Sequence, residues 1–352
     1  MKPIYLIIST ILLGPVLLFT TNCSTKKGDD NSDTTAGPIV SEEINYIGSV
    51  EVLDPAFTRF SADARPELLA EGYEWTEGPV WIEDGGYLLY SDIPPNSIFK
   101  WSEAKGAELY LKPSGFTGEI EREGEPGSNG LLLNTQGQLV LCQHGDRRMA
   151  YMNAPLNQPA PNYVTIADSY EGKRFNSPND AVYNSKGELY FTDPPYGLEK
   201  NMDDPAKEIP FQGVYRIDTE GKVHLLVDSL TRPNGIGLSP DDKTLYVANS
   251  DGERMWYSAF DLDEGGNVSG GKILYDATSA KGEGKGGPDG MDIDKAGNLW
   301  ATGPGGVWII SPEGNVLAKI RTTQATANCT LDTREEYLYI TADMYLLRLK
   351  LN

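Results

Sequence analysis

The sequence has little positive charge and no helical pattern. Its 352 residues include 30 Lys plus Arg against 51 Asp plus Glu, which gives a net charge of −21. Such an acidic surface repels phosphate backbones, so nucleic acid is excluded as a partner. No segment combines an N-cap with a sustained 3.6-residue apolar period, and the chain is therefore predicted to be nearly all β.

The N-terminus carries an apolar run that resembles a targeting signal. Ile4 to Phe19 is mostly apolar and too short for a comfortable membrane span. It ends at Thr-Thr-Asn-Cys, as in a bacterial lipoprotein signal, although Asn22 departs from the small residue usual before the lipidated Cys. We expect a signal peptide over residues 1–22, a lipid anchor at Cys23 as the membrane attachment, and a periplasmic or outer-membrane location. Plain secretion and an uncleaved anchor are the alternatives.

Residues 23–43 are predicted to be a flexible tether and residues 44–352 a single folded domain. The segment from Ser24 to Ala36 is rich in Asp, Thr, Lys and Gly, and too poor in apolar residues to fold by itself. We expect the folded domain to be a monomer.

Six polar residues recur just before apolar runs, at intervals of 52, 50, 55, 55 and 39 residues. A period of this length indicates a repeat architecture. Each repeat contains four short apolar runs separated by Gly and Asp/Asn turn residues, for example DAVYN, LYFTD, GVYRID and VHLLVD. The recurring residues are Glu77, Asn129, Asn179, Asn234, Asp289 and Asn328.

These repeats predict a six-bladed β-propeller with four-stranded antiparallel blades. The last repeat runs out of chain before a fourth strand, and PELLAE at residues 66–71 is similar to the outer strand VHLLVD. We therefore expect an N-terminal strand to close the last blade, with a strand packed beneath the propeller as the alternative. Cys142 and Cys329 fall in repeats two and six, which are not neighbours, so both are predicted to be buried free thiols.

In this topology the six recurring residues begin the innermost strands and surround the mouth of the central channel. They offer two carboxylates, Glu77 and Asp289, and four amide oxygens, without a Cys or His. Oxygen ligands suit a hard divalent cation, Ca²⁺ before Mg²⁺, Mn²⁺ or Zn²⁺, and two negative charges balance one such ion. The alternative is that these residues only cap turns, which explains Asn129 and Asn328 well but Glu77 poorly.

Several motifs resemble the gluconolactonase branch of the family that includes senescence marker protein (regucalcin), with more distant similarity to paraoxonases. They are EGPVW at 77–81, CQHGDRR at 142–148, GKRFNSPNDAV at 172–182, FTDPPYG at 191–197, RPNGIGLSPDDKTLYV at 232–247, PDGMDIDKAGNLW at 288–300 and, more weakly, NCTLD at 328–332. The resemblance covers about residues 50–352. It implies hydrolysis of a sugar-acid lactone.

The resemblance also implies roles for individual residues. Glu77, Asn234 and Asp289 fall on the family's metal ligands, and Asn179 on an Asn that is a ligand or a substrate contact. Ser177 replaces the Arg that recognises the sugar in regucalcin-type members, so that role does not transfer.

The implied cation would polarise the lactone carbonyl and orient the attacking water. Either Asp289 or His144 could take the water's proton, and His144 could instead support a neighbouring residue. Asn129, Arg147 and Tyr196 are candidate substrate contacts beside Asn179, and Asp180 a candidate supporting residue. His224 is expected to be structural.

Two other functions remain open. The same ring could hydrolyse another ester or a phosphotriester, or the propeller could bind a carbohydrate or partner without turnover around a structural calcium. The lactone itself is not predicted, because specificity is expected in the long loops 112–128 and 198–212.

Overall fold

The computed structural model describes residues 44–120 and 122–352. The predicted signal peptide, the lipidation at Cys23 and the tether lie outside the described residues and stay predictions. No helix in the described part of the chain is long and apolar enough to cross a membrane.

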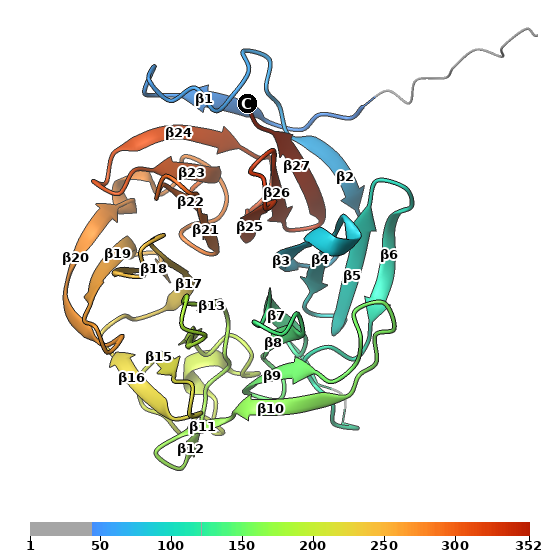
Figure 1. The fold of residues 1–352 in the computed structure, drawn as a ribbon, viewed down its shortest axis with the longest axis vertical. Helices are drawn as coiled ribbons and strands as arrows, with labels where there is room; N and C mark the ends of the chain where they lie inside the picture. The colour runs from blue at the N-terminus through green and yellow to red at the C-terminus, as the bar shows by residue number, and fades with distance from the viewer. Residues whose placement is uncertain (1–43, 121) are drawn as a thin grey trace, which may run out of the picture. The chain divides into compact units, whose positions relative to one another are not determined.

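Six small antiparallel sheets surround a central axis, which confirms the predicted six-bladed propeller (Figure 1). In each sheet the first strand of the repeat is innermost. Blade 1 consists of β3 (Thr76–Ile82), β4 (Tyr87–Asp92), β5 (Ser97–Ser102) and β6 (Gly106–Leu111). Blade 2 consists of β7 (Ser128–Leu133), β8 (Leu139–Gln143), β9 (Arg148–Met152) and β10 (Tyr163–Ala167). Blade 3 consists of β13 (Ala181–Tyr183), β14 (Leu189–Asp193), β15 (Gly213–Ile217) and β16 (Val223–Val227).

The remaining three blades complete the ring. Blade 4 consists of β17 (Pro233–Leu238), β18 (Thr244–Asp251), β19 (Arg254–Leu262) and β20 (Val268–Asp276). Blade 5 contains β21 (Met291–Ile293), β22 (Leu299–Gly303), β23 (Gly306–Ile310) and β24 (Val316–Arg321). Blade 6 consists of β25 (Asn328–Leu331), β26 (Tyr337–Ala342), β27 (Tyr345–Lys350) and the N-terminal strand β2 (Glu67–Glu71). Three 3₁₀ turns, η1 (Glu83–Gly85), η2 (Asn201–Asp203) and η3 (Thr278–Ala280), are the helical segments of the described chain.

The last blade is closed by the N-terminal strand, as predicted. β2 pairs antiparallel with β27, and Glu67 lies opposite Arg348. The Arg348 guanidinium donates to Glu67 Oε2 at 2.8 Å and to Glu103 Oε2 at 2.7 Å, which joins the last blade to the first. It also lies over the rings of Trp101 and Tyr337.

Two features of the fold were not predicted. A strand before β2, β1 (Ser49–Val52), pairs with β24 and gives the fifth blade an additional strand. A short hairpin of β11 (Ser169–Tyr170) and β12 (Lys173–Arg174) precedes the third blade.

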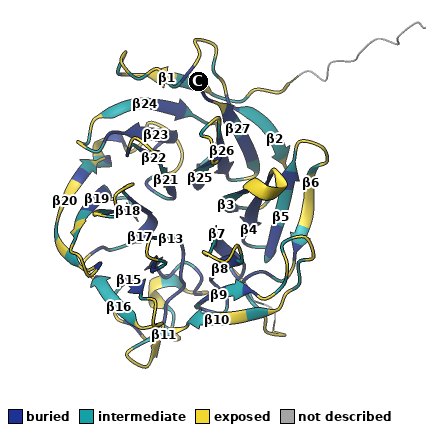
Figure 2. Cartoon of the chain, viewed as in Figure 1, coloured by how far each residue is buried: buried dark blue, intermediate teal, exposed yellow. Residues whose placement is uncertain are grey.

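The core lies between neighbouring blades. Strands near the axis are mostly buried, whereas the outer strands β6, β10 and β20 consist mainly of exposed and partly buried residues (Figure 2). Large aromatic side chains, including Trp300 and Trp308, are fully buried between the sheets. Cys142 and Cys329 are buried free thiols, as expected.

Candidate metal and substrate site

Five of the six recurring residues line one small pocket, which we call the mouth pocket. Its volume is about 180 Å³. Each of blades 1 to 5 contributes one recurring residue to it, either as the second residue of the innermost strand or two residues before that strand begins. The lining residues are Trp75, Glu77, Glu125, Asn129, Asn179, Tyr196, Asn234, Ser250 and Asp289.

The inner strands turn these side chains toward the axis by interrupting their pairing with the second strand. The β3–β4 register shifts between Glu77 and Val80, and the β17–β18 register shifts between Pro233 and Ile236. Such irregularities re-aim a side chain near a functional site. The residue after the recurring one is often Gly, because the neighbouring blade approaches closely: a Cβ on Gly235 would lie 2.1 Å from Asp289 O.

Glu77 and Asp289 place two carboxylates in the same pocket; Glu77 is buried, and Asp289 is partly buried with its Oδ1 fully buried. Burial raises the pKa of Glu77 to about 8, although the Gly78 N–H donates to its Oε2 at 3.0 Å. Burial, followed by the negative charge of Glu77, raises the pKa of Asp289 well above its usual range. Both shifts show that the protein alone does not compensate the two negative charges.

Two oxygens of the mouth pocket lack a partner among the described residues. Asp289 Oδ1 and Asn129 Oδ1 are both buried without a hydrogen bond from residues 44–120 or 122–352. A buried oxygen without a donor is costly and points to a ligand that the protein itself does not supply.

The amide nitrogens of Asn179 and Asn234 each have a partner outside the other amide. Asn234 Nδ2 donates to Ser250 Oγ at 3.0 Å, and Asn179 Nδ2 lies 3.4 Å from His144 Nε2. Each engaged nitrogen leaves a carbonyl oxygen for a ligand. Two carboxylates with amide oxygens are a donor set that fits a hard divalent cation. Within the described chain no group of three or more His, Cys, Asp or Glu forms a metal cluster, so amide oxygens are needed to complete such a site.

His144 lies behind the pocket wall and is not among the lining residues. Its side chain is fully buried, with Nδ1 3.3 Å from Glu125 Oε2 and Nε2 facing Asn179. This placement corresponds to the supporting role that the sequence left open for His144.

The structure does not bring Arg147 into the mouth pocket. Its guanidinium donates to the backbone oxygens of Phe175 at 2.7 Å and Ala206 at 2.9 Å, and a longer 3.4 Å bond reaches Arg174 O. These carbonyls engage the donors of Arg147, which connects the loops around β12, and the substrate contact expected for Arg147 stays a prediction. Tyr196, in contrast, lines the pocket as expected.

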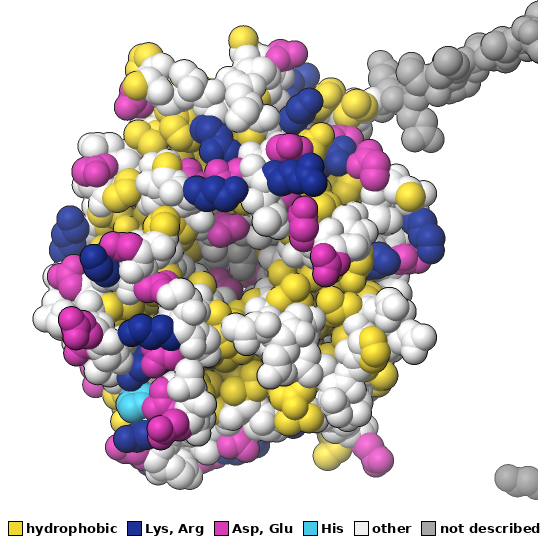
Figure 3. Space-filling view, viewed as in Figure 1, with side chains coloured by type: hydrophobic (Ala, Val, Ile, Leu, Met, Phe, Trp, Pro, Cys, Tyr) yellow, Lys and Arg dark blue, Asp and Glu magenta, His cyan; other side chains and the backbone are white. Residues whose placement is uncertain are grey.

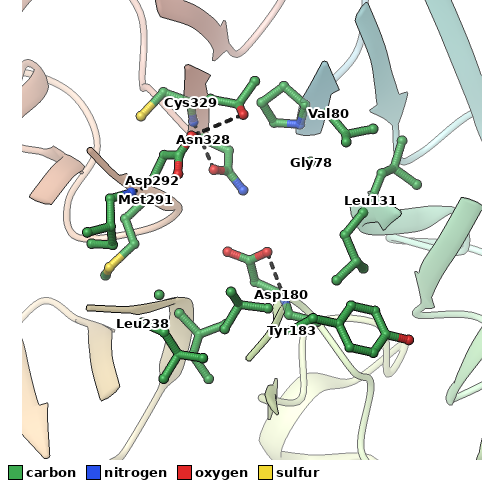
Figure 4. Close-up of a pocket in the computed structure, with 18 of the residues that line it drawn as sticks. Gly78, Val80, Leu131, Asp180, Tyr183, Leu238, Met291, Asp292, Asn328 and Cys329 are labelled. Carbon is green, nitrogen blue, oxygen red and sulfur yellow. Dashed lines mark hydrogen bonds between the residues drawn. The ribbon is translucent and has the colours of Figure 1, made fainter. Parts of the chain in front are cut away.

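Asn328 and Asp180 face the other side of the ring, where they border a second cavity of about 340 Å³ along the channel. Figure 4 shows Asp180 pointing into this cavity below Asn328. Burial raises the pKa of Asp180 to about 7, and the Asn328 side chain partly offsets the shift. Asn328 Oδ1 accepts from Cys329 N at 2.8 Å, in line with the turn-capping alternative.

The cavity belongs to the central channel of the propeller. Its lining includes residues from the innermost strands of all the blades. Figure 3 shows a hollow at the centre of the viewed face, with acidic side chains beside it.

Trp75, Glu125 and Ser250 were not predicted as site residues. Ser250 lies near the end of a second strand, a position that faces the mouth in this topology, and Glu125 lies in the long loop where specificity was expected. Trp75 comes just before the first inner strand and carries no comparable signal in the sequence.

The fold and the site together define the class of protein: a six-bladed β-propeller with a polar pocket of carboxylates and amides at the mouth of its channel. Residues 75–343 match the family described as SMP-30/Gluconolactonase/LRE-like region. The chain belongs to this family.

Relatives with known names agree with this assignment. The chain is 36% identical to a gluconolactonase of Zymomonas mobilis over 311 residues, or 86% of each chain. It is 28% identical to human regucalcin over 66% of this chain and 69% of that protein. A solved gluconolactonase structure from Xanthomonas campestris superposes with a TM-score of 0.74 at 27% identity, covering 89% of this chain and 99% of the other.

Proposed function

We propose that this protein is a lactone hydrolase that opens a sugar lactone at the mouth pocket, with a divalent cation held there. The hydrolase assignment follows from its family and from the named gluconolactonase relatives. The observation that supports the cation is the buried, unpartnered Asp289 Oδ1 in the same pocket as the buried Glu77 carboxylate.

Glu77, Asn179, Asn234 and Asp289 would hold the cation, and their oxygen donors favour Ca²⁺. When bound, the cation polarises the lactone carbonyl and stabilises the negative charge that develops on its oxygen. This charge arises when the oxygen of water bonds to the carbonyl carbon.

Asp289 takes the proton of the attacking water. Asp289 lines the mouth pocket, whereas the imidazole of His144 lies behind Asn179, and this difference supports Asp289 as the base. The ring C–O bond then breaks and the ring oxygen receives a proton, which yields the open hydroxy acid. Asn129 and Tyr196 line the same pocket and contact the substrate.

Proton release from δ-gluconolactone tests the proposal with protein that has been stripped of metal and then reloaded with Ca²⁺. We expect turnover only after reloading, and a loss of at least about 100-fold in kcat for Asp289→Asn. Asp292→Asn is the matched control, because this partly buried carboxylate on the inner strand that follows Asp289 borders the channel cavity instead.

Two results would contradict parts of the proposal separately. Equal turnover by stripped and reloaded protein would exclude the role of the cation. Absence of turnover on a panel of sugar lactones would exclude the hydrolase and favour a propeller that binds without catalysis.

A further inference from the structure

Glu125 gives the mouth pocket a third carboxylate, at a different depth from the other two. Its side chain is 35% exposed, whereas Glu77 is 2% exposed as a whole residue. Glu125 belongs to the loop that connects β6 to β7 and lies on the wall of the pocket. It can therefore meet the part of a substrate that extends outward from the reacting carbonyl.

The loop that carries Glu125 is held at both of its ends. Asn96 Oδ1 accepts from Ser114 N at 2.9 Å and Gly115 N at 2.7 Å, while Asn96 Nδ2 donates to Phe116 O at 2.8 Å. At the other end, Gly127 N donates to a backbone oxygen of the β4–β5 turn at 3.0 Å. These bonds anchor the two ends of the loop on the first blade.

Arg122 connects the middle of the loop to two other blades. Its guanidinium donates to Gly145 O at 2.5 Å and Gly197 O at 3.0 Å, and it lies over the Phe116 ring. His144 Nδ1 lies 3.3 Å from Glu125 Oε2 without a hydrogen bond between them, so the position of Glu125 depends on the contacts of its loop. A carboxylate on a loop held by such contacts loses little freedom when it binds a hydroxyl group.

The chemistry of the pocket favours an uncharged ligand rich in hydroxyl groups. Among the described lining residues there are three carboxylates, three amides and two hydroxyls, and no Lys or Arg. Arg122 and Arg147 donate to backbone oxygens, and neither they nor Arg232, whose charge acts on Tyr196, is among the lining residues. A phosphate or carboxylate on the substrate would meet Glu125 with no lining Lys or Arg to pair with.

We propose that Glu125 is a specificity-determining residue that accepts hydrogen bonds from the hydroxyl groups of an uncharged polyhydroxy lactone and disfavours phosphorylated lactones. This inference rests on the proposed function of the mouth pocket. Hydroxyl groups bind strongly to a carboxylate, and a substrate that lacks them leaves the acceptor without that partner.

The test compares Glu125→Gln with Glu123→Gln on three lactones. Glu123 is an exposed carboxylate on the same loop and outside the pocket, so it controls for the charge change. For Glu125→Gln we expect KM for δ-gluconolactone to rise about tenfold and kcat/KM for unsubstituted δ-valerolactone to stay within twofold. Discrimination against a 6-phosphorylated gluconolactone should weaken in the same variant, and Glu123→Gln should match wild type throughout.

Calorimetry with the non-hydrolysed δ-gluconolactam and δ-valerolactam keeps the inference separate from turnover. The inference is supported if Glu125→Gln, but not Glu123→Gln, binds the hydroxylated lactam more weakly than wild type does. This conclusion would hold even if wild type hydrolysed no lactone, because absence of turnover would overturn only the proposed function. Unchanged binding overturns the inference whatever the turnover. Equal losses for the hydroxylated and unsubstituted compounds also overturn it, because they would show a general effect on the pocket.

Discussion

At the scale of single residues, the mouth pocket gathers negative charge that its own side chains do not neutralise. Glu77 is buried, Asp289 is partly buried, and the more exposed Glu125 lines the same pocket. Burial is the main cause of the raised pKa of Glu77 and of Asp289. Their ionised forms therefore destabilise the metal-free fold and favour binding of a cation.

The metal-free protein should lose stability as Glu77 ionises. Its pKa is raised from 4.5 to about 8 in the folded protein, so between these values the folded state retains a proton that the unfolded chain releases. The contribution of Glu77 to the free energy of unfolding is therefore highest below pH 4.5 and falls as the pH rises toward 8. Urea denaturation in a chelator should show this fall in wild type and a smaller one in Glu77→Gln.

Subtracting the free energy of unfolding of Glu77→Gln from that of wild type at each pH separates the contribution of Glu77 from those of other titrating groups. Parallel curves for wild type and Glu77→Gln would contradict the assignment. At the upper end of this pH range, Ca²⁺ at 100 times its Kd should stabilise wild type by about 2.7 kcal/mol.

At the scale of elements, the inner strands are shaped by contacts with the neighbouring blade. Gly235 N donates to Asp289 O at 3.0 Å, and Gly130 N donates to Asn179 O at 2.8 Å. These bonds connect one inner strand to the next at the level of the pocket. The position of each oxygen donor therefore depends on the strand beside it.

Gly235→Ala should disturb this connection. The new Cβ would lie 2.1 Å from Asp289 O, so one of the two strands must move. We expect a loss of about 1–3 kcal/mol in stability, together with weaker cation binding. Gly287→Ala is the control, because its Cβ would meet Met255 at an ordinary 3.6 Å. Denaturation and calorimetry with Ca²⁺ measure both effects, and equal behaviour of the two variants would contradict the prediction.

At the scale of the whole ring, β2 and β27 join the two ends of the propeller domain. Arg348 is central to this closure because it binds Glu67 and Glu103 and lies over Trp101 and Tyr337. Its side chain is only 12% exposed and that of Glu67 25%, so solvent weakens this ion pair less than it weakens the pair with Glu103, whose side chain is 76% exposed. Trp81 and Tyr339 stack across the same junction between the first and last blades.

Arg348→Ala should destabilise the closed ring by about 2 kcal/mol, because two carboxylates lose their partner and two aromatic rings lose packing. Arg334→Ala is the comparison: it removes a guanidinium that is 70% exposed and 3.7 Å from Glu83. We expect that variant to stay within about 0.5 kcal/mol of wild type. Thermal unfolding measures both, and a similar Tm for the two variants would argue against the role of Arg348.

The repeat and the closing strand could be predicted because their signals are local. Polar residues, short apolar runs and turn residues recur along the chain, and each specifies a strand and its end. The additional strand β1 gave no such signal, because its pairing with β24 joins segments far apart in the sequence.

The sequence by itself determined the blade count, the ring closure and the set of residues that begin the inner strands, since periodicity and turn chemistry depend on neighbouring residues. Only the tertiary structure decided which of those oxygens share the mouth pocket. It placed Asn328 on the channel side, His144 behind Asn179 and Glu125 on the pocket wall. The partners of Arg147 lie 27 to 59 residues away along the chain, so no local pattern could show that backbone oxygens occupy its donors. The physical reason is that the residues which bury and charge this pocket come from several blades, so their arrangement depends on how the blades pack together.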